Sequence, residues 1–323
     1  MFSKIISTGS YLPEKILTNA DLAQMVETND DWIYSRTGIK QRHIAAANQH
    51  TSDLAYEAII LALKKANLTI EDIDGIIVAT STPDLTFPST ATITQRKLGK
   101  ARGFAFDIQA VCSGFIYALS VADSMIIAKR ANRILVVGAE VFSRIIDWKD
   151  RNTCVLFGDG AGAVILENTP DDPKEKNHPG ILGVDIFSDG SFVDALKTDS
   201  GTAFNQRSGF IVMNGQEVYK NAIEKLATVA EYILARNNLD KSQINWLIPH
   251  QANVRIINSL GNKLELAADK IIITINDHAN TSAASIPLAL DFALKSNKVK
   301  QNDLILLAAM GAGFTWGACL LRA

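Results

Sequence analysis

Two distant parts of the chain share one pattern of residues, and this repetition constrains the fold more than any single motif. Residues 67–79 and 238–250 each begin with Asn-Leu, carry Ile at the same place in a short linker, and end in an apolar run. The glycine-rich segment 157–166 is echoed in the same way by residues 310–321. Both pairs lie roughly half the chain apart, which indicates an internal duplication into two similar α/β halves.

We place the boundary between these halves in the polar, proline-rich stretch 168–179. The first half is then residues 1–170 and the second half is residues 171–323. Extended and helical patterns alternate in both, which is typical of α/β proteins. The patterns predict strands over 5–10, 73–80, 163–166, 246–248, 271–275 and 318–321. They predict helices over 19–26, 51–66, 116–130, 215–237 and 254–264, and a polar turn over 29–38. Pro287 lies in a further helical run after residue 282, whose start the pattern does not fix.

Composition narrows the class of protein. The 323 residues carry a net charge of −2, so nucleic acid and anionic membrane surfaces are not expected as main partners. The three cysteines are scattered at 112, 154 and 319, a spacing that fits neither a disulfide framework nor a metal site. The N-terminal apolar run is too short for a signal peptide, and no uncharged apolar segment reaches the ~18 residues of a membrane span. We therefore expect a cytoplasmic protein.

The glycine clusters at 158–162 and 311–317 raise the possibility of a nucleotide-binding loop. A dinucleotide fingerprint must follow a strand and open a helix. Here each cluster leads into an apolar strand instead, so we reject a Rossmann-type site. Close approach of two backbones explains these glycines better.

Cys112 stands where an apolar extended run ends and a mostly uncharged helical run begins. Free N–H groups at the start of a helix favour a thiolate, which makes Cys112 a candidate nucleophile. A satisfied core cysteine is the other interpretation, and this stretch alone does not separate them.

Two polar residues of the second half occupy comparable junctions. His250 follows the predicted strand 246–248, and Asn280 precedes a helix as Cys112 does. Ligands in open α/β sheets collect at the carboxyl ends of strands. Under the duplication, Asn280 lies near the counterpart of Cys112.

Four motifs now resemble one family, and the resemblance covers essentially the whole chain. They are Val111-Cys112-Ser113-Gly114-Phe115, Pro249-His250-Gln251-Ala252-Asn253, residues 280–285 (Asn-Thr-Ser-Ala-Ala-Ser) and residues 311–317 (Gly-Ala-Gly-Phe-Thr-Trp-Gly). In order and spacing they look like the signatures of bacterial 3-oxoacyl-[acyl-carrier-protein] synthase III. The resemblance implies the thiolase fold, with two duplicated α/β halves packed as a layered α-β-α-β-α core.

The resemblance also implies a reaction without a cofactor or a metal. Cys112 would accept an acyl group from acetyl-CoA or a similar primer, with the backbone N–H groups of Cys112 and Ala312 as an oxyanion hole. Malonyl-acyl carrier protein would then lose CO₂, and its enolate would attack the acyl-cysteine to give 3-oxoacyl-carrier protein and start type II fatty acid synthesis. Asn280 offers only hydrogen bonds, so Asn280 with His250 would stabilise the enolate oxygen.

Further positions match the family's binding surfaces. The positions that bind coenzyme A in the family are matched by Trp32, Arg36, Thr37, Arg151 and Asn253. Around the acyl pocket we expect Phe87, Phe157 and Met213. The patch that docks the carrier protein is matched by Arg255, Lys220 and Lys263. Phe87 matches a residue that lines the partner subunit's pocket, which implies a homodimer and favours short, straight primers. Without the resemblance, Trp32 would be interpreted as a hydrophobic staple, and Arg255, Lys220 and Lys263 as ordinary solvated side chains.

Two departures and several alternatives remain. Ser113 replaces an alanine that is common after the nucleophile, and Ala312 stands in a turn that is often all glycine; neither change removes a backbone donor. A biosynthetic thiolase would need a second cysteine near residue 310, and a hydroxymethylglutaryl-CoA synthase would need a catalytic glutamate. Papain-like proteases place their cysteine differently. A ketosynthase or acyltransferase of specialised metabolism, and a binding protein without turnover, stay open.

Overall fold

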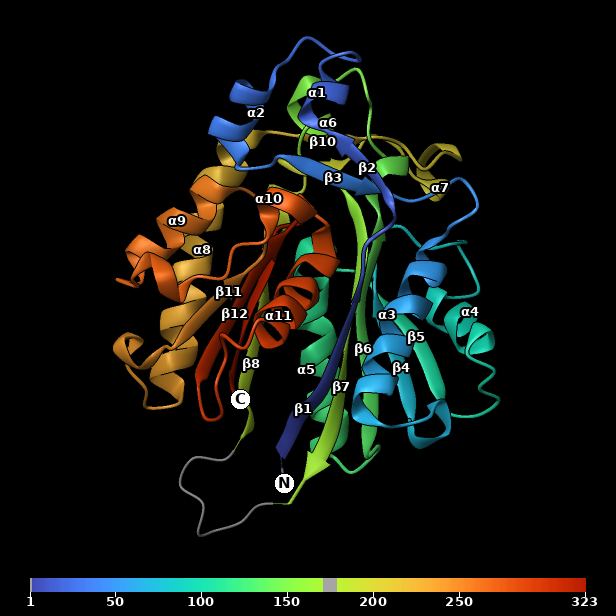
Figure 1. The fold of residues 1–323 in the computed structure, drawn as a ribbon, viewed down its shortest axis with the longest axis vertical. Helices are drawn as coiled ribbons and strands as arrows, with labels where there is room; N and C mark the ends of the chain where they lie inside the picture. Colours follow the sequence, from blue (N-terminus) through green and yellow to red (C-terminus); the bar gives the residue numbers. More distant parts are fainter. Residues whose placement is uncertain (1, 171–178) are drawn as a thin grey trace.

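The computed structural model describes residues 2–170 and 179–323, and it contains two β-sheets that enclose a pair of helices (Figure 1). The first sheet has the strand order β1-β7-β6-β4-β5 and the second has the order β11-β12-β13-β8. Helices α5 (Gly114–Ile127) and α11 (Ser285–Lys295) contact both sheets, so they form the central layer. Helices α3 (Thr51–Ala66) and α4 (Thr90–Lys97) cover the outer face of the first sheet, and α8 (Gly215–Arg236) and α9 (Val254–Lys263) cover the second. The expected α-β-α-β-α layering is confirmed.

The strands of each sheet come from one part of the chain. The first sheet comprises β1 (Phe2–Tyr11), β4 (Gly75–Ala79), β5 (Phe104–Ile108), β6 (Arg133–Val141) and β7 (Asp159–Thr169). The second comprises β8 (Gly180–Ser188), β11 (Trp246–Pro249), β12 (Leu304–Gly311) and β13 (Thr315–Arg322). Residues 171–178 of the predicted boundary lie outside the described residues, so the division at 170/171 stays a prediction.

Smaller elements surround this core. Two ribbons pair β2 (Lys15–Thr18) with β3 (Gln41–Ile44) and β9 (Leu196–Thr198) with β10 (Ile211–Met213). The short helices are α1 (Asn19–Leu22), α2 (Asp30–Thr37), α6 (Arg151–Cys154), α7 (Thr202–Asn205) and α10 (Ile275–His278). Single 3₁₀ turns are η1 (Ile70–Asp72), η2 (Val111–Ser113), η3 (Phe142–Arg144), η4 (Gly190–Phe192), η5 (Lys241–Gln243), η6 (Ala268–Lys270) and η7 (Ser282–Ala284). Among the described residues no helix is both long and apolar enough to span a membrane.

The duplication is visible as a constant spacing between equivalent elements. Strands β4 and β11, helices α5 and α11, and strands β6 and β12 each begin 171 residues apart. The turns η2 and η7, which precede the two central helices, each begin with a residue at positive φ: Val111 at 47° and Ser282 at 49°. The position equivalent to Cys112 is therefore Ala283, three residues after Asn280.

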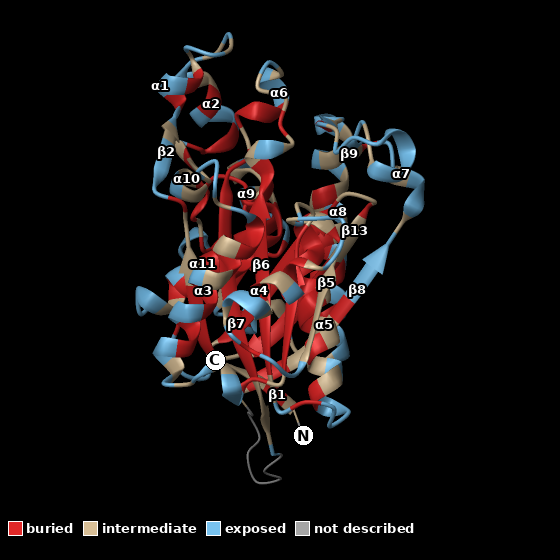
Figure 2. Cartoon of the chain, turned by 90° about the vertical axis from the view of Figure 1, so that its right-hand side faces the viewer, coloured by how far each residue is buried: buried red, intermediate tan, exposed pale blue. Residues whose placement is uncertain are grey.

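The buried residues follow the layers. Figure 2 shows most of the strands as the buried interior, with the exposed residues on the outer helices, the loops and the end of β8. Helix α5 is apolar on most faces because sheets cover it on both sides; Phe115, Ile116 and Leu119 are fully buried. Pro287 is the third residue of α11, where a helix needs no N–H donor, so it does not break the helix.

Three predicted elements differ from the structure. Residues 29–38 were expected as a turn but form α2 and its two caps. The Asn29 side chain caps the start of the helix by accepting from the Trp32 N–H, and Gly38 ends the helix in a left-handed conformation with a φ of 78°. The helix expected over 19–26 is only the four residues of α1. The central helix α5 begins two residues before the predicted start at 116 and ends three residues before the predicted end at 130.

The predicted strand 271–275 is also wrong, and the cause is one side chain. Only an isolated bridge joins Ile271 to Leu247, and residue 275 already begins α10. The Gln251 amide accepts from the N–H groups of Thr274 and Ile275, and it donates to the carbonyl of Ile272. These bonds satisfy backbone groups that a neighbouring strand would otherwise have to pair.

Substitution of Gly138 tests the packing between the halves. A Cβ on Gly138 of β6 would lie 2.2 Å from the Ala283 carbonyl oxygen of η7, so Gly138→Ala forces strand and turn apart. We expect a loss of ~1–3 kcal/mol in the free energy of unfolding, as for overpacked cores. Gly190→Ala is the matched control, because its Cβ would meet nothing within 4 Å. Equal denaturation midpoints for the two variants would contradict this account.

Candidate active site

Cys112 is held in a strained turn between the two sheets. It is the middle residue of η2, and Val111 before it adopts a positive φ that a β-branched residue rarely takes. The end of β12 closes on this turn: a Cβ on Gly311 would lie 2.7 Å from the Cys112 nitrogen and 2.8 Å from the Ala110 carbonyl oxygen. A glycine at 311 is therefore required for this approach.

The environment of Cys112 corrects one expectation. The start of a helix was expected to favour the thiolate, but Cys112 is only 6% exposed, and burial raises the pKa of its thiol to about 12. Desolvation outweighs the hydrogen-bonding interaction with the Ser282 hydroxyl, which lowers that pKa, and the charge of Glu140 raises it further. In the free protein Cys112 is a neutral thiol at pH 7.

His250 directly follows β11 and is fixed by its backbone N–H, which donates to the Ala308 carbonyl of β12 at 2.8 Å. Its side chain is buried, and desolvation lowers the pKa of the imidazole to about 3. The ring is thus neutral across the physiological range, and its Nδ1 has no hydrogen-bond partner among the described residues. A neutral imidazole can donate one hydrogen bond into the site but is a weak base.

Asn280 is fixed by its backbone and oriented by its side chain. Its N–H donates to the Leu156 carbonyl and its carbonyl accepts from Gly158, each at 3.0 Å. The Asn280 Oδ1 accepts from the Ser282 N–H at 2.9 Å. Because the oxygen is used inside the turn, the NH₂ group is the part of this amide that remains to donate.

These three side chains meet at one pocket of about 240 Å³. Its walls also include Phe157 and Met213, expected at the acyl pocket, and Trp32, Arg36, Thr37 and Asn253, expected at the coenzyme A site. The structure thus brings together residues from both halves that the motifs singled out. Their roles stay predictions.

The mouth of the pocket carries a cationic aromatic cluster. The guanidinium groups of Arg36 and Arg151 lie 4.6 and 4.9 Å from the centre of the Trp32 ring. Arg151 also donates to the Glu27 carbonyl. The Thr37 hydroxyl is used within α2, where it donates to the Ile33 carbonyl at 2.7 Å. Asn253 caps α9 by accepting from the Arg255 N–H.

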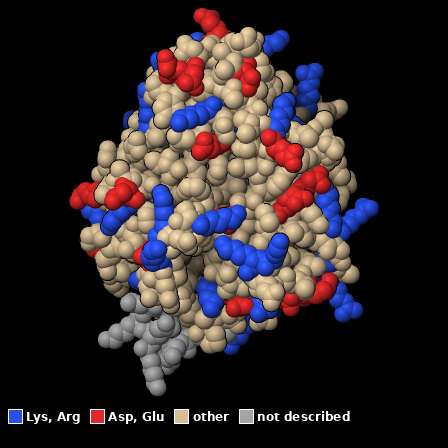
Figure 3. All heavy atoms as spheres, in the orientation of Figure 1, with Lys and Arg blue, Asp and Glu red and all other residues tan. Residues whose placement is uncertain are grey.

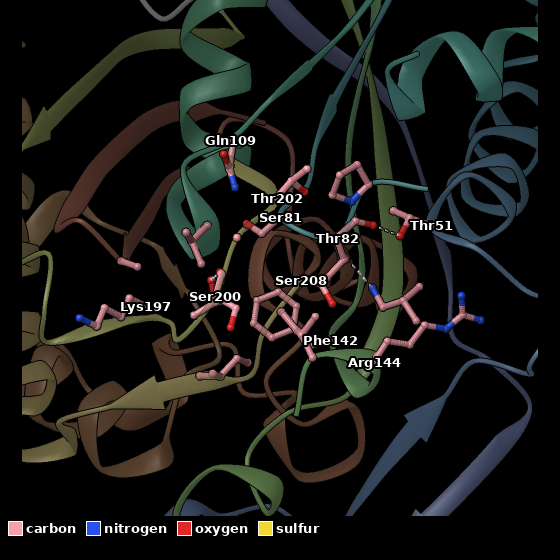
Figure 4. A pocket seen from close by; sticks show the side chains of 18 of the residues that line it. Thr51, Ser81, Thr82, Gln109, Phe142, Arg144, Lys197, Ser200, Thr202 and Ser208 are labelled. Atoms are coloured by element: carbon pink, nitrogen blue, oxygen red, sulfur yellow. Dashed lines mark hydrogen bonds between the residues drawn. The ribbon is translucent and has the colours of Figure 1, made fainter. Parts of the chain in front are cut away.

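A second, wider cavity of about 900 Å³ also has Cys112 in its wall, and Figure 4 shows its polar lining. Cys112, Phe157 and Ala312 line it together with hydroxyl-bearing residues, among them Thr51, Ser81, Thr82, Ser200, Thr202 and Ser208. Phe87 lines neither cavity, and its side chain is 82% exposed. Phe87 therefore does not shape the pocket of its own chain.

The three basic residues expected at a carrier-protein surface are all exposed. Arg255 and Lys263 lie on α9 and Lys220 on the adjacent α8. Arg255 also donates to the Ser35 carbonyl at 3.2 Å, which ties α9 to α2. On the face shown in Figure 3, basic and acidic side chains are interspersed.

The buried polar groups on the turn and strand next to Cys112 were not predicted from the sequence. Glu140 is fully buried on β6, and Ser282 donates to its carboxylate at 3.1 Å. The available signal was an acidic residue inside the apolar run 134–142. In the part of the chain that the structure describes, no group of three or more His, Cys, Asp or Glu side chains could hold a metal ion.

Comparison with known proteins agrees with this geometry. Residues 106–190 match the family "3-Oxoacyl-[acyl-carrier-protein (ACP)] synthase III", and residues 234–323 match its C-terminal counterpart. The chain is 54% identical over 320 residues, 99% of each chain, to the Beta-ketoacyl-[acyl-carrier-protein] synthase III of Ehrlichia ruminantium (strain Gardel). The chain belongs to the 3-oxoacyl-[acyl-carrier-protein] synthase III family.

Solved structures of similar proteins share the whole fold. The 3-oxoacyl-[acyl-carrier-protein] synthase III of Aquifex aeolicus VF5 superposes with a TM-score of 0.93 at 47% identity, covering 99% of this chain and 100% of that one. The priming β-ketosynthase of the R1128 polyketide pathway gives a TM-score of 0.92 at 30% identity, covering 99% and 96%. The family's fold is therefore complete in this chain.

Labelling with a thiol reagent tests the placement of the three free cysteines. Cys112 lines both cavities, whereas Cys154 and Cys319 are fully buried and line neither. N-ethylmaleimide should therefore add to one site in the native protein, and Cys112→Ala should abolish that addition. Because burial raises the pKa of the thiol, this addition at pH 7 should be slower than that of an exposed cysteine. Intact mass spectrometry would contradict the structure if the native protein gained two adducts.

Proposed function

We propose that this chain catalyses the decarboxylating condensation of an acyl-CoA primer, acetyl-CoA in the first instance, with malonyl-acyl carrier protein. The products are 3-oxoacyl-carrier protein, coenzyme A and CO₂, and the reaction initiates type II fatty acid synthesis. The observation that carries the proposal is the convergence of Cys112, His250 and Asn280 on one pocket, in a chain of the synthase III family.

In the first half-reaction Cys112 attacks the thioester carbonyl of the primer. The close approach of Gly311 to the η2 turn sets the backbone N–H groups of Cys112 and Ala312 on adjoining segments, where they can donate to the oxygen that becomes negative. Exchange of one thioester for another is nearly balanced in energy, so the acyl group is stored on Cys112 at little cost.

In the second half-reaction the enolate oxygen of the decarboxylated malonyl group needs hydrogen-bond donors. The Asn280 NH₂ group and the neutral imidazole of His250 are such donors, and both are buried, where hydrogen bonds to a developing charge are strongest. The enolate carbon then attacks the acyl-cysteine carbonyl, and the Cys112 sulfur leaves.

The surface around the mouth supports the two substrates. Trp32 with the neighbouring Arg36 and Arg151 offers an aromatic ring and two cations, which suit an adenine ring and phosphates. Thr37 and Asn253 line the same pocket as Trp32 and Arg36, and we assign them to the pantetheine arm. The exposed cations Arg255, Lys220 and Lys263 suit the acidic surface of a carrier protein.

We also propose a homodimer in the cytoplasm. Strand β5 is a sheet edge and carries the half-buried, stacked Phe104 and Phe106, while Phe87 projects from the surface. The 900 Å³ cavity beside Cys112 has room for a side chain such as the partner's Phe87. Phe87 in that place would limit the primer to short, straight chains. All three cysteines are free thiols, as expected in a reducing compartment.

A ketosynthase of specialised metabolism is the alternative, because it could keep the same three residues and differ only in pocket shape. The 54% identity to the synthase III of Ehrlichia ruminantium, against 30% to the R1128 priming ketosynthase, favours fatty acid synthesis.

The two half-reactions should respond differently to loss of the donors. We expect Asn280→Ala and His250→Ala each to lower decarboxylation of malonyl-carrier protein by about 10²–10³-fold, as for the loss of one oxyanion-hole donor. Acylation of Cys112 by acetyl-CoA, followed by intact mass, should persist and serves as the internal control. Because His250 is neutral, decarboxylation should show no inflection near pH 6.5. Equal losses in both half-reactions would contradict the assigned roles.

Charge reversal tests the carrier-protein surface. Arg255→Glu should raise the KM for malonyl-carrier protein at least several-fold, with an effect that shrinks as salt is added, because the surface charges are screened. Acetylation from acetyl-CoA should change much less. Lys298→Glu, an exposed lysine outside α8 and α9, is the control. An unchanged KM for the carrier protein would remove Arg255 from this surface.

A further inference from the structure

A buried carboxylate lies behind the nucleophile, and the reaction outlined above does not use it. Glu140 on β6 is fully buried and accepts from the hydroxyls of Thr80 at 3.2 Å, Thr82 at 2.6 Å and Ser282 at 3.1 Å, and from the Ser81 N–H at 3.0 Å. A carboxylate in a core is costly unless it has such partners. All four groups donate hydrogen bonds to Glu140, and an ionised carboxylate, which only accepts, suits this arrangement.

The Ser282 hydroxyl links this carboxylate to the turn that carries Cys112. It donates to the Glu140 Oε1 at 3.1 Å, and the same side chain lowers the pKa of the Cys112 thiol. The two turns that carry Ser282 and Cys112 are packed against each other, and Ser282 is 1% exposed. A hydroxyl that donates to a carboxylate keeps its lone pairs for a second donor, here the S–H group.

The resting thiol needs a base, and the neighbouring histidine is a poor one. Desolvation lowers the pKa of His250 to about 3, whereas burial raises the pKa of Glu140 to about 7. Among the groups around Glu140, Cys112 is the titratable one, and it lies beyond Ser282. The loop after β4 contributes the hydroxyls of Thr80 and Thr82 and the backbone N–H of Ser81, none of which is charged. A base with a pKa near the working pH is the effective one.

We propose that Glu140, acting through the Ser282 hydroxyl, receives the proton that Cys112 loses when it attacks the acyl donor. As the bond between the sulfur and the acyl carbon forms, the thiol proton moves to the Ser282 oxygen, and the hydroxyl proton of Ser282 moves to Glu140. When the carbon–sulfur bond to coenzyme A breaks, the same proton returns through Ser282 to the departing thiolate. The Cys112 thiol and the acyl-CoA thioester are consumed, and the acyl-cysteine thioester and the coenzyme A thiol are formed, so atoms and charge balance.

This arrangement keeps one negative charge in the buried site at each stage. A thiolate beside a carboxylate would place two like charges in a low-dielectric core, which is strongly disfavoured. Transfer of the proton to Glu140 removes that repulsion at the moment when the sulfur becomes nucleophilic. Glu140 does not touch the substrate and is thus a positioning residue, and Ser282, on the turn packed against that of Cys112, relays the proton between them.

The inference rests on the proposed function, so the test uses an acyl donor that needs no coenzyme A site. The burst of p-nitrophenol released from p-nitrophenyl acetate reports acylation of Cys112 directly, with Cys112→Ala as the blank. In the wild type the burst rate should rise with pH, level off above about pH 7 and fall in D₂O. Glu140→Gln and Ser282→Ala should each lower it about 10²-fold at pH 8 and abolish the inflection.

Two further variants separate proton transfer from structural damage. Glu140→Asp should restore part of the rate and the inflection. Asp159→Asn is the control, because Asp159 is also a fully buried carboxylate, on the adjacent strand, but bonds to Ser143 and Ala45 instead. It should lower the melting temperature and leave the shape of the pH profile unchanged. The double variant of Glu140 and Ser282 should be no slower than either single one, because the two act in series.

Three results would overturn the inference. A faster burst in Glu140→Gln would mean that Glu140 is only a charge that raises the pKa of the thiol. Lower melting temperatures with unchanged pH profiles would mean that the chain of hydrogen bonds is only structural. No burst from Cys112 in the wild type would remove both the inference and the nucleophile, whereas a normal burst without acylation by any acyl-CoA would remove only the proposed substrate.

Discussion

The site depends on one packing constraint, the contact of two backbone turns between the sheets. Turns η2 and η7, equivalent in the two halves, lie against each other, and glycines at 138 and 311 let the strands of both sheets reach them. Each turn begins with a residue at positive φ, a conformation that is retained only when the surroundings enforce it. Cys112, His250 and Asn280 are thereby brought to one pocket from segments far apart in the sequence.

Burial then determines the chemistry. Desolvation makes the thiol of Cys112 and the imidazole of His250 neutral in the resting state, and it raises the pKa of the Glu140 carboxyl. A site made of neutral donors around a neutral nucleophile binds substrate weakly by charge but stabilises charge strongly as it develops. The cations that suit coenzyme A and the carrier protein are solvent-exposed, so their charges are screened by water and do not change the protonation of the buried groups.

Much of this was predictable from the sequence, and the exceptions have physical causes. The repeat predicted two α/β halves, and four motifs predicted the residues that converge on the pocket, because these depend on local pattern. The short helix α2 was missed although Asn29 and Gly38 are ordinary cap residues, since its interior lacks a clear apolar face. The strand expected at 271–275 failed because the Gln251 side chain, distant in sequence, pairs with that backbone. Glu140 and Ser282 lie 142 positions apart in the sequence, so no local pattern of residues could predict their contact.

The most direct test of the account is the intact mass of the protein after mixing with acetyl-CoA, measured for the wild type and for Cys112→Ala. We expect a gain of one acetyl group in the wild type, its absence in the variant, and its discharge when malonyl-acyl carrier protein is added. An acetyl group that persists in Cys112→Ala, or a wild type that no acyl-CoA modifies, would contradict the assignment of Cys112 as the acyl acceptor.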